Sequence, residues 1–166
     1  MEKALAVANE IIILGKAAGD PVTQMKLQKL MFYAHGWHLV FEDAPLIDQQ
    51  FEAWKFGPIV PSVYRIFRHH MMAPIEVLGT EVRETYGGRL VETAPPPIPS
   101  SSDAAALLRR TWEVFGKYTG GQLTGMTHAE GTPWTITREK SGNRDGAPIP
   151  DKLIKHYFDG VRNGKW

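Results

Sequence analysis

The sequence predicts a mainly α-helical fold, with residues 1–166 forming one compact domain. Three segments favour this fold because apolar side chains recur along them at helical spacing: 2–18, 23–42 and 103–118. The composition is that of a folded protein, since 43% of the residues are apolar and 22% are charged. A chain of this length buries roughly two-thirds of the surface that its unfolded form exposes. Besides the helices, we expect only a short extended segment and a small β-hairpin.

The first two helices follow each other closely. The helix over 2–18 ends at the turn of residues 19–21, where glycine and proline interrupt the pattern. The hydroxyl of Thr23 then caps a second helix over 23–42. One broad apolar face of this helix carries Leu27, Leu30, Met31, Ala34, Trp37 and Phe41. The opposite face, which we expect to be exposed, carries Lys26, Lys29 and Tyr33.

An aromatic and proline-rich stretch, FEAWKFGPIVPSVYRIF, occupies residues 51–67. Residues 49–56 are predicted to be extended, which places Trp54 and Phe56 on one side of the segment and Lys55 on the other. We expect Trp54 and Phe56 to be mainly structural, because aromatic side chains usually pack in cores. Pro61 suits the first turn of a third helix that runs to about residue 70.

The rest of the chain alternates loops with shorter helices. Gly87 and Gly88 favour a two-residue hairpin turn between strands at 83–86 and 89–92. The stretch APPPIPSSSD, at 94–103, favours a long loop because its prolines are incompatible with a helix interior. Further helices are predicted at 103–118, at 122–129, from Thr132 onward, and at 151–159, where Gly160 ends the last one, with a loop at 141–150.

The sequence holds no complete catalytic or metal-binding pattern. The absence of cysteine excludes disulfides and thiolate metal ligands. His35 and His38 lie one helical turn apart, but no carboxylate lies one turn away to complete a metal site. His128 and Glu130 do not form the HExxH pattern of zinc proteases. We therefore expect no enzymatic activity, no metal and no cofactor.

The net charge of +1 favours neither nucleic acid nor a membrane as the partner. One alternative stays open, because neighbouring second and third helices would join several cations into a basic patch beside aromatic side chains. Its cationic residues are Lys26, Lys29, Arg65, Arg68, His69 and His70, and the stacking residues are Trp54 and Tyr64. This patch would suit a nucleic-acid-binding accessory protein.

The N-terminal apolar run is interrupted by Asn9, Glu10 and Lys16. It is too polar and too short for a membrane span, and it lacks the basic start of a signal peptide. Together with the absence of cysteine, this favours a cytoplasmic location.

Two blocks of the sequence, taken together, resemble one known family. The first is KLQKLMFYAHGWHLVFEDAPLIDQQFEAWKFGPIVPSVYRIF, at 26–67, and the second is LTGMTHAEGTPW, at 123–134. A closing segment, IPDKLIKHYF at 149–158, is also similar. These segments resemble the Panacea domain, also called the SocA-like or phage-associated GepA-like family. The WKFGPIVPSVY element, at 54–64, is its specific signature. Residues from about 71 to 102 match no part of this pattern and are interpreted as a variable insertion.

The resemblance implies a mostly helical fold and the role of antitoxin in a toxin–antitoxin module. Such an antitoxin binds and neutralises a toxin protein encoded beside it. A prophage-associated nucleic-acid-binding accessory protein stays as the alternative. A homo-oligomer is compatible with the sequence.

We predict the partner-binding surface at the signature element, because two prolines and a glycine stiffen its backbone and a preorganised surface loses less entropy on binding. The candidate partner-binding residues are Trp54, Lys55, Phe56, Gly57, Pro58, Ile59, Pro61, Tyr64, Arg65 and Arg68, with Lys26, Lys29 and Tyr33 on the second helix. The motif residues expected to be structural are Trp37, Thr127, His128, Glu130, Gly131, Pro133 and Trp134.

Overall fold

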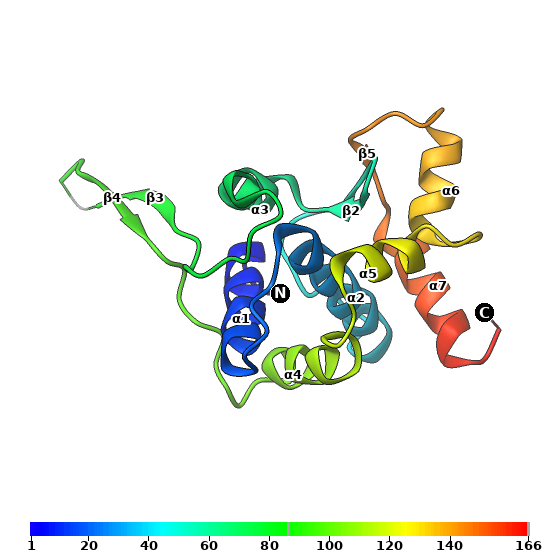
Figure 1. Cartoon of the computed structure of the whole chain (residues 1–166), viewed down its shortest axis with the longest axis horizontal. Coiled ribbons are helices and arrows are strands. Elements are labelled where there is room, and N and C mark those ends of the chain that lie inside the picture. Colours follow the sequence, from blue (N-terminus) through cyan, green and yellow to red (C-terminus); the bar gives the residue numbers. More distant parts are fainter. Residues whose placement is uncertain (86, 166) are drawn as a thin grey trace.

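The mainly α-helical fold class is confirmed by the structure, a computed structural model that describes residues 1–85 and 87–165 (Figure 1). In these residues the α-helices are α1 (Ala4–Ala17), α2 (Gln24–Phe41), α3 (Pro61–Phe67), α4 (Asp103–Phe115), α5 (Gly120–Thr127), α6 (Pro133–Lys140) and α7 (Asp151–Arg162). The strands are β1 (Glu52–Trp54), β2 (Gly57–Ile59), β3 (Glu81–Glu84), β4 (Leu90–Thr93) and β5 (Ala147–Pro148). A 3-10 turn, η1 (Arg68–His70), follows α3.

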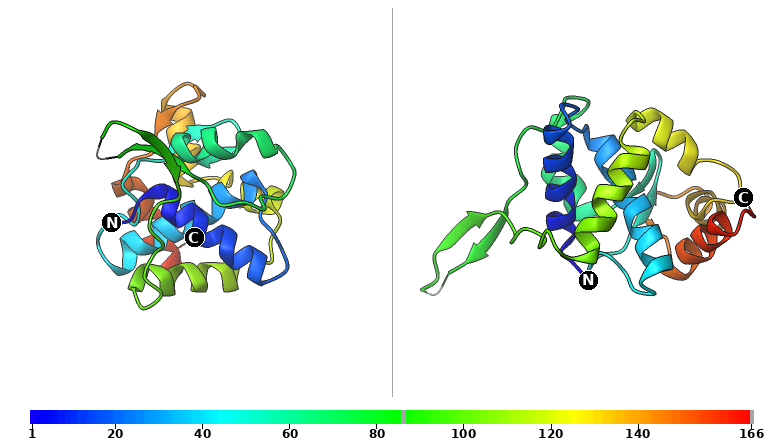
Figure 2. Two further views of the ribbon diagram at one scale, coloured as in Figure 1. Left: turned by 90° about the vertical axis from the view of Figure 1, so that its left-hand side faces the viewer. Right: turned by 90° about the horizontal axis from the view of Figure 1, so that it is seen from below.

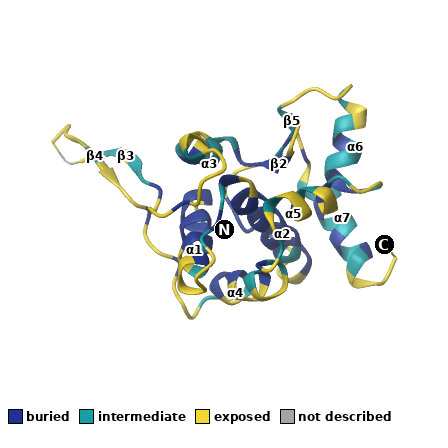
Figure 3. Cartoon of the chain, viewed as in Figure 1, coloured by how far each residue is buried: buried dark blue, intermediate teal, exposed yellow. Residues whose placement is uncertain are grey.

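Helix α2 lies at the centre of the molecule, where α1, α4, α5, α7 and β2 pack around it (Figures 1 and 2). Its first turn is capped as predicted, since the Thr23 hydroxyl accepts a hydrogen bond from the backbone N–H of Lys26. Because neighbours surround the helix, both faces are buried over most of its length (Figure 3).

The expectation that Lys26, Lys29 and Tyr33 face solvent is therefore wrong. Their exposed fractions are 6%, 1% and 8%. The apolar periodicity identifies one buried face, but it carries no information about a second layer of elements that covers the other face. Phe41 shows the opposite error: it was predicted on the buried apolar face, but it lies at the end of the helix and is 58% exposed.

Helices α2 and α7 approach closely at Gly36. A Cβ atom added at Gly36 would lie 2.3 Å from the ring of Phe158, so this contact requires a residue without a side chain. The Phe158 ring also packs edge-on against Trp37, with ring centroids 5.1 Å apart. This contact holds the C-terminal helix on the central one.

The signature element forms a tight hairpin instead of one extended segment. Strands β1 and β2 pair antiparallel with Trp54 opposite Gly57, so Lys55 and Phe56 form the turn between them. Gly57 has a φ of +103°, which glycine adopts without the strain other residues suffer. The chain reversal removes Phe56 from the side that Trp54 occupies and leaves its ring 62% exposed. The expectation that Phe56 is mainly structural is wrong.

A third strand, β5, pairs antiparallel with β1 and gives the sheet order β2-β1-β5. Residues 141–150 were expected to form a loop, so this strand was not predicted. Strand β5 is short, and Ala147 is only partly buried, so backbone pairing rather than side-chain periodicity defines it.

The helix boundaries agree with the prediction to within a few residues at most ends. Pro61 occupies the first turn of α3, and the Ser102 hydroxyl caps α4 by accepting from the N–H of Ala105. The last helix was expected to end at Gly160, but α7 continues to Arg162. Gly160 is buried within that helix, so its backbone freedom is not used to stop it.

Strands β3 and β4 form a hairpin that projects away from the helical body (Figures 1 and 2). The hairpin is predicted correctly, but its turn is longer than two residues, since the Thr85 N–H donates to the carbonyl of Arg89. Gly87 and Gly88 both adopt positive φ there. The predicted strand residue Tyr86 lies outside the described residues. Val82 and Leu90 are exposed on this arm.

Within residues 1–85 and 87–165, no helix has both the length and the apolar character needed to cross a membrane.

Candidate functional site

Trp54 is one of the residues that fix the signature hairpin to the body. The indole N–H of Trp54 donates to a carboxylate oxygen of Glu52 at 2.7 Å, and its ring lies beside that of Tyr64, with centroids 5.3 Å apart. The backbone carbonyl of Trp54 accepts a 2.8 Å hydrogen bond from the indole N–H of Trp134. Trp54 is thus half-buried and anchored at both its side chain and its backbone.

The second sequence block supplies the support for this hairpin. Residue His128, after α5, stacks flat on Trp134 of α6, with ring centroids 3.6 Å apart. The Thr132 hydroxyl donates to the carbonyl of Thr127 at 2.7 Å and accepts from the N–H of Thr135, which caps α6. The structure therefore brings the two blocks into direct contact. Of the other motif residues, Pro133 is buried at the start of α6, and Trp37 packs on Phe158. Gly131 adopts a φ of +76°, and Glu130 is exposed.

Lys29 passes underneath the hairpin. A Cβ atom added at Gly57 would lie 2.4 Å from Cε of Lys29 and 3.1 Å from the hydroxyl of Thr127, so only glycine allows this crossing. The ammonium Nζ lies 3.5 Å from the carbonyl oxygen of Pro58, a long hydrogen bond. Burial lowers the pKa of Lys29 to about 7, because a desolvated ammonium is costly. Burial, with Lys29 and Arg138 nearby, also lowers the pKa of His128.

Lys26 and Tyr33 have structural partners instead of a free surface. The Lys26 ammonium pairs with a carboxylate oxygen of Asp20 at 2.6 Å and lies 5.0 Å from the ring centre of Trp112. Tyr33 stacks on Phe115, with centroids 4.4 Å apart, and burial together with Tyr157 raises the pKa of its phenol. These two residues are not available to a partner.

The remaining candidates divide into exposed and supporting residues. The exposed ones are Lys55, Phe56, Arg65 and Arg68, and the half-buried ones are Trp54, Pro61 and Tyr64. The buried ones are Gly57, Pro58 and Ile59, which shape the turn from beneath. The expected basic patch loses Lys26 and Lys29 to burial, which leaves Arg65, Arg68 and His69 exposed and His70 partly so.

A groove of about 270 Å³ lies beside the hairpin turn, between α2 and α3, and we call it the Lys29 groove. Its polar lining residues are Gln24, Gln28, Lys29, Tyr64 and Arg68. Its apolar lining residues are Met25, Phe56, Ile59, Met71 and Met72. Gln24, Met25 and Gln28 were not predicted as site residues. The available signal in the sequence is two glutamines close to a lysine near the start of a helix otherwise rich in apolar residues.

The two histidines weighed as metal ligands have other partners. Nε2 of His35 lies 3.1 Å from a carboxylate oxygen of Asp151, and Nδ1 of His38 lies 2.7 Å from the carbonyl of Ala44. Among the described residues, no group of three or more histidine, cysteine, aspartate or glutamate side chains gathers where it could hold a metal ion.

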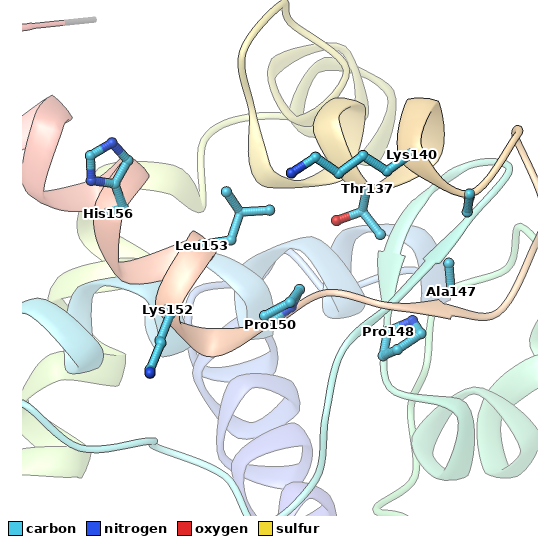
Figure 4. Close-up of a pocket in the computed structure, with 9 residues that line it drawn as sticks. Thr137, Lys140, Ala147, Pro148, Pro150, Lys152, Leu153 and His156 are labelled. Carbon is cyan, nitrogen blue, oxygen red and sulfur yellow. The ribbon is translucent and has the colours of Figure 1, made fainter.

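A second cavity, of about 510 Å³, lies between α6, β5 and the first turns of α7 (Figure 4). In Figure 4, Lys140 extends from α6 over the space next to Leu153. Lys152 and His156 also line the cavity. This cavity includes none of the candidate site residues.

Comparisons with known proteins identify a family match that spans both blocks. The family model described as antitoxin SocA-like, Panacea domain, matches residues 27–135, which cover both blocks except Lys26. The chain is 34% identical over 157 residues to a protein named Antitoxin SocA from Caulobacter vibrioides (strain NA1000 / CB15N). The aligned region covers 93% of this chain and 81% of that relative. No solved structure matches the chain significantly.

Proposed function

This chain belongs to the SocA-like family of antitoxins with a Panacea domain, and from this premise we propose that it neutralises a toxin protein, encoded beside it, by direct binding. The premise supports a toxin as the general class of partner. Neutralisation by binding needs a complementary surface and no catalytic group, so the proposed role is non-enzymatic.

The observation that carries the proposal is the exposed ring of Phe56 on a braced turn. Phe56 is 62% exposed, so its apolar ring is largely in contact with water in the free protein. Covering this ring with a partner buries apolar surface, which contributes favourably to the free energy of binding. Lys55 lies next to it in the turn, with its ammonium 5.5 Å from the centre of the Phe56 ring. Tyr64 and Arg68 line the adjoining groove. Aromatic and arginine side chains are enriched at the centres of protein interfaces.

Contacts beneath the hairpin turn hold it in one conformation, which favours binding by preorganisation. The hydrogen bond from Trp134 to the Trp54 carbonyl and the crossing of Lys29 under Gly57 limit the conformations of the hairpin before a partner arrives. A surface that is already ordered loses less conformational entropy on association. We therefore place the toxin on the face formed by Lys55, Phe56 and Tyr64.

The test expresses the adjacent open reading frame alone and together with this chain. The proposal expects that the neighbour arrests growth, that this chain restores growth, and that the two proteins purify as a stoichiometric complex. Phe56→Ala should weaken the complex by about thirtyfold, the effect of losing an interface hot spot of roughly 2 kcal/mol. Lys55→Glu and Tyr64→Ala should weaken it as well.

A matched control exists in Phe41→Ala. Phe41 has nearly the same exposure, 58%, but it lies at the far end of the 18-residue helix α2, roughly 18 Å along the helix from Lys29, the nearest α2 residue of the groove. Phe41→Ala should leave binding and growth rescue unchanged. If Phe56→Ala, Lys55→Glu and Tyr64→Ala all fold and neutralise the toxin fully, the binding face lies elsewhere.

A further inference from the structure

The Lys29 groove holds hydrogen-bond donors and cations without an acidic partner. None of the described residues that line it is acidic, whereas two of them, Lys29 and Arg68, are basic. Lys29 is 1% exposed, and among the described residues its ammonium has only the long hydrogen bond to the Pro58 carbonyl. Since a buried ammonium without a counter-ion is unfavourable, a ligand that supplies negative charge here is stabilised more than at an ordinary surface lysine.

Two amide side chains in the same groove also have polar atoms without a hydrogen-bond partner among the described residues. Neither side-chain polar atom of Gln24 has a hydrogen-bond partner among the described residues, although this residue is only 6% exposed. Gln28 accepts from the N–H of Val60 at 2.8 Å, but its amide nitrogen donates to no described group. Buried amide donors are normally satisfied, so the groove has unused hydrogen-bonding capacity for an acceptor.

The rim of the Lys29 groove is apolar and exposed. Met71 and Met72 are 78% and 89% exposed, and Met25 and Phe56 add further uncovered apolar surface. Met71 also has a φ of +52° with a ψ of −109°, a combination that is strained for a residue with a side chain. Flexible methionine side chains around a charged centre suit a peptide segment that is itself largely apolar.

We propose that the Lys29 groove receives one acidic side chain, carried by an otherwise apolar segment of the toxin, with its carboxylate bound by Lys29, Arg68 and the glutamine amides. The inference rests on the proposed function, which supplies a protein as the occupant. The cationic groups of the groove favour a carboxylate on the toxin segment. The methionine and phenylalanine side chains at the rim favour apolar residues on either side of that acidic residue.

The geometry favours this occupant over a nucleic acid. Phosphate backbones are bound by several solvent-facing cations along a track, whereas this groove has one exposed cation, Arg68, and one buried one. Its volume of about 270 Å³ fits one side chain with its immediate flanks.

The first arm of the test measures affinity of the purified toxin from the adjacent reading frame for variants of this chain by calorimetry. Arg68→Ala and Gln24→Leu should each weaken binding about tenfold, and Lys29→Met should weaken it at least as much while the variant remains folded. Arg109→Ala on α4, where Arg109 is also exposed and lies outside the groove, should bind within about threefold of the wild type. If Lys29→Met fails to fold, Arg68→Ala and Gln24→Leu still decide the question.

The second arm locates the carboxylate on the toxin. Each Asp and Glu of the toxin is changed singly to Asn or Gln. One such toxin variant is expected to bind the wild-type form of this chain about tenfold more weakly than the unchanged toxin does. The same toxin change should have little further effect on binding to the Arg68→Ala variant of this chain. Loss of binding on extending the toxin C-terminus by one residue, with no sensitive acidic side chain, would instead assign a terminal carboxylate and overturn the proposal. Competition by 50 mM sodium acetate alone, without any sensitive toxin residue, also overturns it.

The two proposals fail in distinguishable ways. Suppose that Phe56→Ala and Lys55→Glu lose toxin binding while Arg68→Ala, Gln24→Leu and Lys29→Met all bind normally. The proposed binding face is then supported, and the proposal of an acidic side chain in the Lys29 groove is wrong. If the wild-type chain does not bind the toxin, the proposed function itself fails. If Arg68→Ala instead loses affinity only for a single-stranded oligonucleotide, the groove belongs to a nucleic-acid site and the acidic anchor is overturned.

Discussion

The indole N–H of Trp134 donates a 2.8 Å hydrogen bond to the backbone carbonyl of Trp54, although the two residues are 80 positions apart in the sequence. This bond joins α6 to the first strand of the signature hairpin. His128 stacks on the same indole, so one side chain connects the end of α5, helix α6 and the hairpin. The two blocks shared with the family therefore form one structural unit.

Trp134→Phe should destabilise the protein by roughly 1–2 kcal/mol, because it removes the hydrogen bond to the Trp54 carbonyl while keeping an aromatic ring against His128. Urea unfolding measures the change in the free energy of unfolding. Hydrogen exchange should show faster exchange at the backbone N–H groups of β1 and β2 than in the wild type, with α1 unaffected. An unchanged unfolding midpoint and unchanged exchange in β1 would show that the bond is not a significant brace.

Gly36→Ala should destabilise the protein by about 2–4 kcal/mol, because the added methyl group would lie 2.3 Å from the Phe158 ring and would force α7 away from α2. Gly125→Ala is the matched control, since a Cβ atom there meets nothing within 4 Å and Gly125 lies in helix α5. That control should be neutral or stabilising by up to about 1 kcal/mol, the difference in helix propensity. Equal effects of the two substitutions on thermal unfolding would contradict the close approach of the helices.

Lys29→Met should stabilise the free protein by roughly 1–4 kcal/mol at pH 7, because it removes a buried ammonium without a counter-ion and keeps a chain of similar length. The pKa of Lys29 is about 7 in the folded state and 10.5 in the unfolded reference. Between these values the unfolded chain binds more protons, so the free energy of unfolding of the wild type rises with pH. The cost of the buried charge is full below pH 7 and is lost as the pH approaches 10.5.

The measurement compares urea unfolding of the wild type and Lys29→Met from pH 7.5 to 9.5. The stability gap between them should narrow by up to about 1.4 kcal/mol per pH unit across this window. The lowered pKa of His128 acts below this window, and the raised pKa of Tyr33 acts above it. A gap that stays constant from pH 7.5 to 9.5 would show that Lys29 does not lose its proton in the folded protein.

Local patterns in the sequence were sufficient for much of this fold. Thr23 and Ser102 cap their helices as predicted, and Pro61 begins α3, because each of these effects depends on residues within one helical turn. The signature element could likewise be located from the sequence, because it is one continuous stretch at residues 54–64. A hairpin was also predicted, with strands at 83–86 and 89–92, and the structure has one with strands at 81–84 and 90–93, in whose turn Gly87 and Gly88 adopt positive φ.

The burial of Lys29 depends on distant parts of the chain, whereas the exposure of Phe56 results from a nearby turn that was not predicted. Lys29 is buried because β2 and α5 cover that side of α2, and helical periodicity contains no information about such neighbours. Phe56 is exposed because β1 turns back after Trp54, where an extended continuation was expected. The groove needs α2, β2 and α3 together, so its lining could be inferred only after these elements were assembled.

The β3–β4 arm is expected to be dispensable for folding, in agreement with the interpretation of residues 71–102 as a variable insertion. Glu81 and Thr93 are paired across the hairpin, so their backbones already lie close enough for a two-residue turn to join them. The variant replaces Val82 to Glu92 with Asn-Gly and leaves Gly79 in place. Gly79 must stay because its backbone exchanges two hydrogen bonds with the Asn9 side chain, at 2.8 and 3.0 Å.

This deletion should change the free energy of unfolding by less than about 1 kcal/mol, since the removed strands expose most of their side chains, including Val82 and Leu90. Binding of the toxin should also be retained, because Phe56 and the Lys29 groove contain no residue of the arm. Asn9→Ala is the comparison, because it removes the two hydrogen bonds that hold the base of the arm and should destabilise the protein by roughly 1–3 kcal/mol. A stable deletion variant that no longer binds the toxin would make the arm part of the binding surface. A deletion variant as unstable as Asn9→Ala would show that the arm contributes to the fold.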